Sequence, residues 1–336
     1  MAVLRFRNRS LSLDAYETVL DCLLRNGEPI PYACKAGMCQ ACLIRAVDCE
    51  ATEESRKWVK PELQAKGYTL ACQWVPDSDV AAALPGIEEF SVAARIIELQ
   101  PLNARVLRVL LVPDEPQRMF AYRPGQYLTL ISPGGLPRSY SIANDYARDG
   151  FIELHLASTA HGEFTGWLFR DARVGMQLHM RGPAGDCYYD ANDGERHPLL
   201  LAGTGTGLAP LYGIARDALR QGHSGPIHLY HGGRTPAQLY YRDELAQLAR
   251  EHDNFRYFAC ASEPGDDGDV LHGRLEPLVE RSIETSLAGQ TRAYVAGAPD
   301  FVYAMRKRLF LKGLRAPNIH CDPFTEREVV AGVKET

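Results

Sequence analysis

The chain has 336 residues and a formal net charge of −5, and its hydrophobic (46%) and charged (24%) fractions are those of an ordinary globular protein. This length predicts two or three domains, and the negative charge argues against nucleic acid as the main partner. No apolar run reaches the roughly 18 residues that span a membrane, so we expect no membrane partner. The first residues lack the apolar core of a signal peptide, and nine cysteines, an odd number, suit a reducing compartment better than a disulfide framework. We therefore expect a cytoplasmic protein.

The chain begins with a strand pattern followed by a helix pattern. Leu4 and Phe6 alternate with arginines, which predicts a half-buried strand. Asp14 is followed three residues later by Glu17, which resembles the start of a capped helix, and Gly27 marks the expected end. The face of this helix that we expect to be buried comprises Tyr16, Val19, Leu20, Leu23 and Leu24.

Four cysteines have the spacing of an iron–sulfur site. Cys34, Cys39 and Cys42 lie on one short loop, and Cys72 follows after 29 further residues. This C-x4-C-x2-C…C pattern is that of plant-type [2Fe–2S] ferredoxins, in which each iron takes two terminal thiolates. A structural zinc site would need a second C-x2-C pair, and a thioredoxin-like pair would leave two of the four cysteines without a role. Cys49 is the competing ligand, and we expect it to be structural because the plant-type pattern is already complete.

The residues around these cysteines carry a family resemblance. The stretches 31–42 and 67–73 resemble a plant-type ferredoxin domain, except that Gln40 stands where that family usually has glycine. The resemblance implies an α+β ferredoxin domain over residues 1–80, with a [2Fe–2S] cluster on the four cysteines. Residues 76–86 contain prolines and a run of small residues, which predicts a linker leaving this domain.

Residues 91–190 change to short β patterns separated by proline and glycine, which predicts an antiparallel β-barrel. The expected strands include 94–99, 105–111, 126–130 and 151–156. Within this domain, the run Arg138-Ser139-Tyr140-Ser141 combines a cation, an aromatic ring and hydroxyl groups. Such groups can pair with a phosphate, stack on a flat ring and hydrogen-bond its edge.

This run, with 123–127 before it and 174–183 after it, resembles the flavin domain of the ferredoxin–NAD(P)+ reductase superfamily. The resemblance implies that Arg138 contacts the flavin phosphate, that Tyr140 stacks on the isoalloxazine and that Ser141 lies near its reactive N5. It also implies a second phosphate-binding turn at Gly162 and Thr165, which opens a helix. FAD is expected rather than FMN, because relatives with this domain order more often carry FAD.

From residue 195 to residue 336, apolar runs alternate with helical patterns, which predicts an α/β nucleotide-binding domain with a parallel sheet. The apolar run 199–202 leads into Gly203-Thr204-Gly205-Thr206-Gly207 and then into a helix pattern. Glycines in such a turn let the backbone approach a pyrophosphate at the helix N-terminus. The turn also resembles the nicotinamide-nucleotide loop of the same superfamily.

Three further positions bear on the nucleotide site. Arg234, at the end of the second predicted strand, is placed to meet the adenosine ribose. An arginine there favours NADPH by the general rule, yet NADH-using relatives carry the same pattern, so we expect NADH and leave NADPH open. Ala296 stands where the family has a cysteine near the nicotinamide. Phe324 matches the family's C-terminal aromatic region beside the flavin, and a buried core aromatic is the alternative.

The resemblance covers about residues 1 to 325 and implies an enzyme, the reductase component of a multicomponent oxygenase. Such a protein passes electrons from NAD(P)H through FAD and the [2Fe–2S] cluster to the oxygenase component. No side chain is expected to act as a catalytic acid, base or nucleophile. A reductase of a deoxysugar-forming pathway is one alternative, and a non-enzymatic iron–sulfur electron carrier is another.

Overall fold

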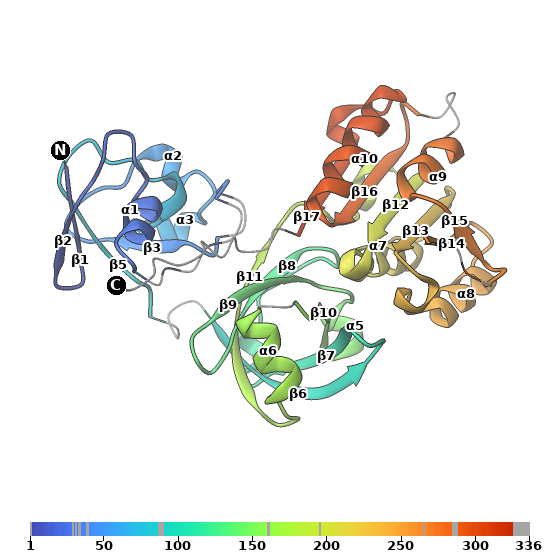
Figure 1. Cartoon of the computed structure of the whole chain (residues 1–336), viewed down its shortest axis with the longest axis horizontal. Helices are drawn as coiled ribbons and strands as arrows, with labels where there is room; N and C mark the ends of the chain where they lie inside the picture. The colour runs from blue at the N-terminus through green and yellow to red at the C-terminus, as the bar shows by residue number, and fades with distance from the viewer. Residues whose placement is uncertain are drawn as a thin grey trace. The chain divides into compact units, whose positions relative to one another are not determined.

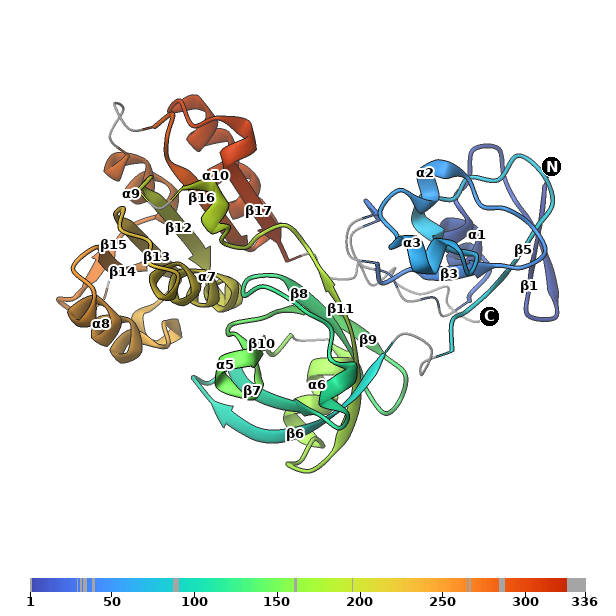
Figure 2. The same ribbon diagram turned by 180° about the vertical axis from the view of Figure 1, so that it is seen from behind.

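The computed structural model describes residues 2–28, 30, 32, 35–37, 40–86, 91–159, 162–194, 196–263, 265, 267–283 and 288–324. The described chain divides into two compact units. One extends to Ser91 and includes 135–139, and the other comprises 92–134 and 140–324. Figures 1 and 2 show the elements of both units from opposite sides. Within the described residues, none of the helices combines the length and the apolar character needed to cross a membrane.

The first unit is built on a mixed five-stranded sheet. Its strands, in the order β2-β1-β5-β3-β4, are β2 (Arg9–Ser12), β1 (Val3–Phe6), β5 (Val80–Ala83), β3 (Leu43–Ala46) and β4 (Tyr68–Leu70). Leu4 and Phe6 are fully buried, as their alternation predicts, and share one core with helix α1 (Val19–Arg25). Two short helices, α2 (Glu53–Arg56) and α3 (Pro61–Gln64), lie between β3 and β4 in the chain.

Helix α1 begins later than the sequence pattern indicates. Its N-cap is Thr18, whose hydroxyl accepts a hydrogen bond from the backbone N–H of Asp21. The Asp14–Glu17 pair forms a turn before the helix, and Tyr16 within it has φ +62° and is 93% exposed. The prediction that Tyr16 lies on the buried face is wrong, because left-handed backbone at this residue cannot continue a right-handed helix. Val19, Leu20 and Leu23 are buried as expected.

Strand β5 lies inside the stretch predicted as a linker. It pairs parallel with β1, where Leu4 faces Val80, and antiparallel with β3. The linker prediction is therefore wrong for residues 80–83, which form the central strand of the sheet. Its alanine-rich sequence hid it, because small side chains give a weak alternation signal.

The predicted antiparallel barrel lies in the second unit, apart from residues 135–139, which group with the first unit. Its strands follow the order β10-β7-β6-β11-β8-β9, and an isolated bridge between Ile142 and Leu154 connects its two edges. Two helices, α5 (Tyr146–Asp149) and α6 (Glu163–Arg170), belong to this part of the chain. The strands are β6 (Val92–Pro101), β7 (Val106–Pro113), β8 (Tyr127–Ile131), β9 (Pro137–Ser141), β10 (Ile152–Ala157) and β11 (Gln177–Ala184), which confirms the four strands expected from the sequence.

The rest of the second unit is a parallel sheet covered on both faces. Its order is β15-β14-β13-β12-β16-β17, so the strand order reverses beside β12. The strands are β12 (Leu199–Thr204), β13 (Ile227–Gly233), β14 (Phe255–Ala261), β15 (Val270–His272), β16 (Arg292–Gly297) and β17 (Ile319–Pro323). The helices are α7 (Leu208–Arg220), α8 (Arg242–Glu251), α9 (Leu275–Ser282) and α10 (Pro299–Leu311).

Alternate residues of β12 enter two different cores. Leu199 and Leu201 pack with residues of α7 and α8, whereas Leu200 and Ala202 pack with residues of α9 and α10. Figure 1 shows these two helix pairs on opposite faces of the parallel sheet. A strand buried on both faces reads as a continuous apolar run, which is the pattern that predicted it.

The barrel and the parallel sheet share the second unit because their backbones approach closely. Gly125, before β8, has φ +96°, and a Cβ there would lie 2.4 Å from the carbonyl oxygen of Cys187 and 2.6 Å from Ile214 of α7. A Cβ on Gly213 of α7 would lie 3.0 Å from the backbone of Ala143. Glycine at these two positions lets α7 pack directly on the barrel.

Candidate functional site

The cysteine site has two of its four predicted ligands among the described residues. Cys42 precedes β3, and Cys72 lies in the short turn η1 (Ala71–Gln73) that follows β4. Because β3 and β4 pair antiparallel, with Leu43 opposite Leu70, both cysteines lie at the same end of this hairpin. The backbone N–H of Ala71 donates to the Cys42 carbonyl over 3.0 Å. Cys34 and Cys39 lie outside the described residues.

The surroundings of Cys72 suit a thiolate ligand. Its side chain is 7% exposed, and the Gln73 side-chain amide donates to its sulfur over 3.4 Å and to the Lys35 carbonyl over 3.1 Å. An N–H directed at a cluster sulfur stabilises its negative charge. These donors and the shared hairpin end fit a cluster held by cysteines. Cys49 instead donates to the Ala81 carbonyl, as expected of a structural thiol.

The position where the family usually has glycine does require a glycine-like backbone. Gln40 has φ +53°, the left-handed region that side chains other than glycine enter at a cost. Its side-chain amide donates to the Trp58 carbonyl over 3.0 Å, which ties the cysteine loop to the segment after α2. Glutamine therefore keeps the backbone geometry and adds a hydrogen bond that glycine could not make.

The flavin motif lies on β9. The Arg138 guanidinium donates to the Pro137 carbonyl, and the Tyr140 ring packs 5.6 Å from the ring of Phe164, a buried residue of α6. Ser139 lies between them on the same strand. Arg138 and Tyr140 are both half-buried, so a planar, phosphate-bearing ligand can reach them.

The predicted second phosphate turn has the expected helix start. Gly162 is the N-cap of α6, and no side chain caps that helix, so its first backbone N–H groups are available to an anion. A Cβ on Gly162 would lie 2.0 Å from the Thr159 hydroxyl. The Thr165 hydroxyl is buried and lies 3.1 Å from that of Thr159, so it stabilises the turn.

The last residue of the motif meets the parallel sheet through a contact that the sequence analysis missed. The Ser141 hydroxyl donates to an Asp322 carboxylate oxygen over 2.8 Å. Asp322 lies near the end of β17, two residues before Phe324. Burial raises the pKa of Asp322 to about 6, although the Ser141 hydrogen bond opposes this, and Asp186 nearby adds to the rise. An acidic residue inside a sheet strand was the available signal.

The nucleotide loop follows β12 at the point where the strand order reverses. Ligands of open parallel sheets bind outside the carboxyl ends of the strands at such a point. A Cβ on Gly207 would lie 2.3 Å from the Ala296 carbonyl oxygen, so only glycine fits between the loop and β16. The Thr204 hydroxyl accepts a hydrogen bond from the backbone N–H of Ala298. Gly203 lies in β12, and Gly205 and Thr206 lie in the turn that leads into α7, so the predicted order of strand, turn and helix is present.

The loop is shaped to bring its backbone close to a ligand. Gly205 has φ +55°, and a Cβ there would meet nothing within 4 Å, which leaves open space over the turn η4 (Gly205–Gly207). This is the cradle that a pyrophosphate at the start of α7 needs. Ala296 in the neighbouring strand is fully buried, and the Phe324 N–H donates to the Gly297 carbonyl.

Arg234 follows β13, as predicted, and its side chain is 69% exposed. The structure adds a neighbour that the local sequence does not show. Glu263, which follows β14, has a carboxylate oxygen 3.6 Å from the Arg234 guanidinium. The position predicted to meet the adenosine ribose thus has an arginine and an acid together.

Three domain families match the chain in succession. Residues 7–77 match the 2Fe-2S iron-sulfur cluster binding domain, residues 94–189 the oxidoreductase FAD-binding domain, and residues 201–307 the oxidoreductase NAD-binding domain. The mixed sheet, the antiparallel barrel and the parallel sheet described above correspond to these three families in the same order.

Relatives with all three parts cover nearly the full chain. The chain is 33% identical to the ferredoxin–NAD(P)+ reductase component of a naphthalene 1,2-dioxygenase system from Pseudomonas putida, over 94% of this chain and 96% of that protein. It is 32% identical to the reductase subunit of an aromatic O-demethylase from Amycolatopsis, over the same shares. The crystal structure of an Amycolatopsis cytochrome P450 reductase superposes with a TM-score of 0.69 at 29% identity, covering 97% of this chain and 99% of that one.

These matches confirm the resemblance found in the sequence and the three cofactors that it implies. The chain belongs to the ferredoxin–NAD(P)+ reductase superfamily, as an NAD(P)H-dependent oxidoreductase with FAD-binding and [2Fe–2S] domains.

Proposed function

We propose that this protein takes electrons from NADH and delivers them, through FAD and its [2Fe–2S] cluster, to an oxygenase component. The observation that supports this most strongly is that Tyr140 and Ser141 of the flavin motif share one compact unit with the nucleotide loop, where Ser141 contacts Asp322. The relatives named above serve a dioxygenase system and a demethylase, which supports an oxygenase as the acceptor.

Each part of the chain would hold one group. Bound flavin converts a two-electron donor into single-electron transfers that a cluster can accept. The chain's own contribution is to bind and orient, and no catalytic acid, base or nucleophile is assigned. The proposed cluster ligands are Cys34, Cys39, Cys42 and Cys72; the proposed flavin residues are Arg138, Ser139, Tyr140, Ser141, Gly162, Thr165 and Phe324; and the proposed nucleotide residues are Gly203, Thr204, Gly205, Thr206, Gly207 and Arg234.

The proposed domains are residues 1–80, 91–190 and 195–336, with the last strand of the first domain continuing to Ala83. We place the protein in the cytoplasm. Cys22, Cys187 and Cys260 are buried thiols outside any disulfide, which suits a reducing compartment.

NADH is the proposed donor. A 2′-phosphate beside Arg234 would also approach the Glu263 carboxylate, and like charges at this distance repel. The ribose hydroxyl of NADH carries no such charge.

The decisive experiment is an anaerobic titration of the purified protein with NADH, followed by absorbance and low-temperature EPR. We expect flavin bleaching and a rhombic signal from a reduced [2Fe–2S] centre, complete at about 1.5 equivalents of NADH because the two centres together accept three electrons. A protein that neither NADH nor NADPH reduces would contradict the proposal.

A matched pair of cysteine variants tests whether electrons leave the protein through the cluster. Cys72→Ala should keep NADH-dependent reduction of ferricyanide, which accepts electrons from flavins directly, and lose reduction of cytochrome c. Cys49→Ala should keep both. Loss of cytochrome c reduction in Cys49→Ala alone would transfer the ligand assignment to that cysteine.

A further inference from the structure

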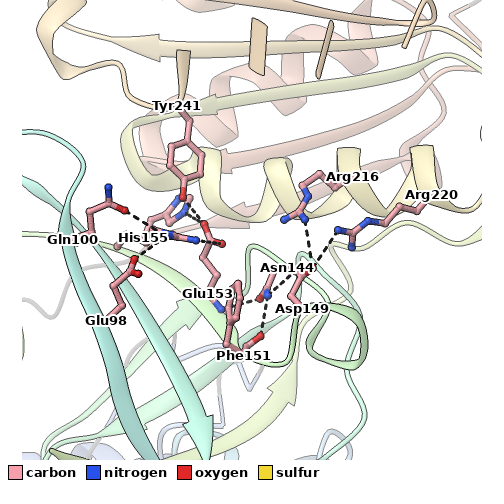
Figure 3. Close-up of polar contacts among 11 residues, drawn as sticks. Glu98, Gln100, Asn144, Asp149, Phe151, Glu153, His155, Arg216, Arg220 and Tyr241 are labelled. Carbon is pink, nitrogen blue, oxygen red and sulfur yellow. Dashed lines mark hydrogen bonds and ion pairs between the residues drawn. The ribbon is translucent and has the colours of Figure 1, made fainter. Parts of the chain in front are cut away.

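A buried carboxylate connects the barrel to the nucleotide-binding half of the second unit. Glu153 of β10 is 2% exposed, and its carboxylate accepts hydrogen bonds from the Tyr241 hydroxyl over 2.6 Å and from the His155 ring over 2.9 Å. Arg108 lies 3.3 Å from its second oxygen. Burial alone would raise the pKa of Glu153, but the hydrogen bonds from His155, Tyr241 and Arg108 lower it to about 2. Figure 3 shows Tyr241 directed from the nucleotide-binding half toward this carboxylate.

His155 joins this carboxylate to a second tyrosine. Its Nε2 faces Glu153, an acceptor only, so Nε2 carries a proton, and its Nδ1 lies 3.0 Å from the Tyr240 hydroxyl. Tyr240 and Tyr241 are consecutive residues, yet both rings contact His155, at centroid distances of 5.2 and 4.9 Å. Tyr241 has a left-handed backbone, with φ +58°, where the side chains of two consecutive residues both point to His155.

Tyr240 connects His155 to the nucleotide loop through His231. The Tyr240 ring packs edge-on against the His231 ring at 5.3 Å, and His231 Nε2 lies 3.1 Å from the Gly205 carbonyl oxygen. Burial lowers the pKa of His231 to about 4, so at neutral pH the ring is uncharged and its Nε2–H donates to that carbonyl. The turn η4 also contacts β10, the strand that carries Glu153 and His155.

We propose that His155 and Tyr240 are positioning residues for nicotinamide-nucleotide binding: they hold the loop 203–207 in place against the flavin barrel. The path runs from the barrel through His155, Tyr240 and His231 to the Gly205 carbonyl. This inference rests on the proposed assignment of the loop as the pyrophosphate site.

A second connection between the same two halves provides a matched control. Asp149 of α5 lies 3.6 Å from Arg216 and 3.3 Å from Arg220, both on α7 (Figure 3). These ion pairs join the barrel to the sheet domain without contacting residues 203–207. If the buried path served only to attach the two halves, Asp149→Asn should act like a change at Tyr240.

The test measures binding of NAD+, which binds without delivering electrons, to the flavin- and cluster-loaded protein by calorimetry. Tyr240→Phe keeps the ring and removes one hydrogen bond, so we expect about fivefold weaker binding. Tyr240→Leu also removes the ring that supports His231, and we expect a loss of tenfold or more. Asp149→Asn should bind within about twofold of the parent protein.

Hydrogen exchange supplies a readout that does not depend on bound nucleotide. Peptides covering 201–207 should exchange faster in both Tyr240 variants than in Asp149→Asn, while flavin content stays constant. Parent-like binding and exchange in Tyr240→Phe and Tyr240→Leu would overturn the proposal, and so would equal effects in Asp149→Asn. Tyr240→Phe decides the matter if the leucine variant fails to fold.

Gly207→Ala separates the two levels of inference. Its Cβ would displace the Ala296 carbonyl, so it should abolish NAD+ binding if the loop is the nucleotide site. Parent-like binding in Gly207→Ala would overturn the loop assignment and this proposal with it. Loss of binding in Gly207→Ala together with parent-like Tyr240 variants would overturn only the positioning role.

Discussion

At the scale of single residues, Asp322 accepts a hydrogen bond from Ser141 of the proposed flavin motif and has a raised pKa. Its folded-state pKa, raised to about 6 chiefly by burial, exceeds the ordinary value of 3.8, so the folded protein holds this proton more tightly than the unfolded chain does. The stabilisation is therefore fully present below pH 3.8 and is lost as the pH rises through about 6.

Replacing Asp322 with asparagine should flatten this pH dependence. We expect the parent protein to lose about 1–2 kcal/mol from this group between pH 4.5 and 7.5, a range that allows for its partial exposure. The measurement is the urea concentration at which half of the flavin is released, determined for the parent protein and for Asp322→Asn at several pH values across that range. An identical pH slope in the parent and in Asp322→Asn would show that another group is responsible.

Arg234 and Glu263 supply the second prediction at this scale. Glu263→Gln removes the charge that opposes a 2′-phosphate, so kcat/KM for NADPH should rise roughly tenfold while the value for NADH changes little. Glu251→Gln, which removes an exposed charge on α8, is the control and should alter neither value. Equal changes for both nucleotides in Glu263→Gln would contradict this account of selectivity.

At the scale of elements, the left-handed backbone of Gln40 in the cysteine loop lowers stability by an amount that can be measured. Gln40→Ala and Gln40→Gly both remove the hydrogen bond to the Trp58 carbonyl, but only glycine relieves the left-handed strain at φ +53°. The glycine variant should therefore be more stable than the alanine variant by about 1 kcal/mol. The denaturant concentration at which the cluster's visible absorbance disappears reports the difference. A more stable alanine variant would mean that the loop adopts another backbone conformation.

The elements also show where sequence patterns were sufficient. Period-two alternation located β1, and continuous apolar runs located the buried strands of the parallel sheet. The start of α1 was misplaced because two capping patterns overlap, Asp14 with Glu17 and Thr18 with Asp21, and both make hydrogen bonds in the structure. Only contacts distant in sequence, such as the hydrogen bond from Val19 N–H to the Trp74 carbonyl, distinguish the true helix start.

At the scale of the whole molecule, the two compact units have separate hydrophobic cores. Leu20 belongs to the core of the first unit and Met305 to a core of the second, and both are fully buried. Leu20→Ala should cost about 3 kcal/mol and lower the temperature at which the cluster is lost by several degrees, without changing the temperature of flavin release. Met305→Ala should do the reverse. Joint shifts in either variant would show that the units unfold together.

The same scale explains which site residues the sequence could predict. Cys42, Cys72, the run 138–141 and the loop 203–207 are local patterns. The structure places Cys42 just before β3, Cys72 just after β4, the run 138–141 on a strand and the loop 203–207 before a helix. Asp322 contacts a residue 181 positions away, and Glu153 meets Tyr241 across 88 positions. One sequence contains no signal for such pairs, because their partners are chosen by how the barrel packs on the sheet.

The contact between Tyr241 and Glu153 has a consequence for recombining such proteins. A chimera that exchanged only the nucleotide-binding part, with a junction near residue 195, would separate this tyrosine from a carboxylate that remains charged inside the barrel. Glu153 would keep Arg108 and His155, which belong to the barrel, but a buried carboxylate that loses a hydrogen-bond donor costs more than a lost surface contact. A chimera that changes nucleotide preference should therefore exchange the barrel and the parallel-sheet domain together. The ferredoxin part is the part that can be exchanged separately.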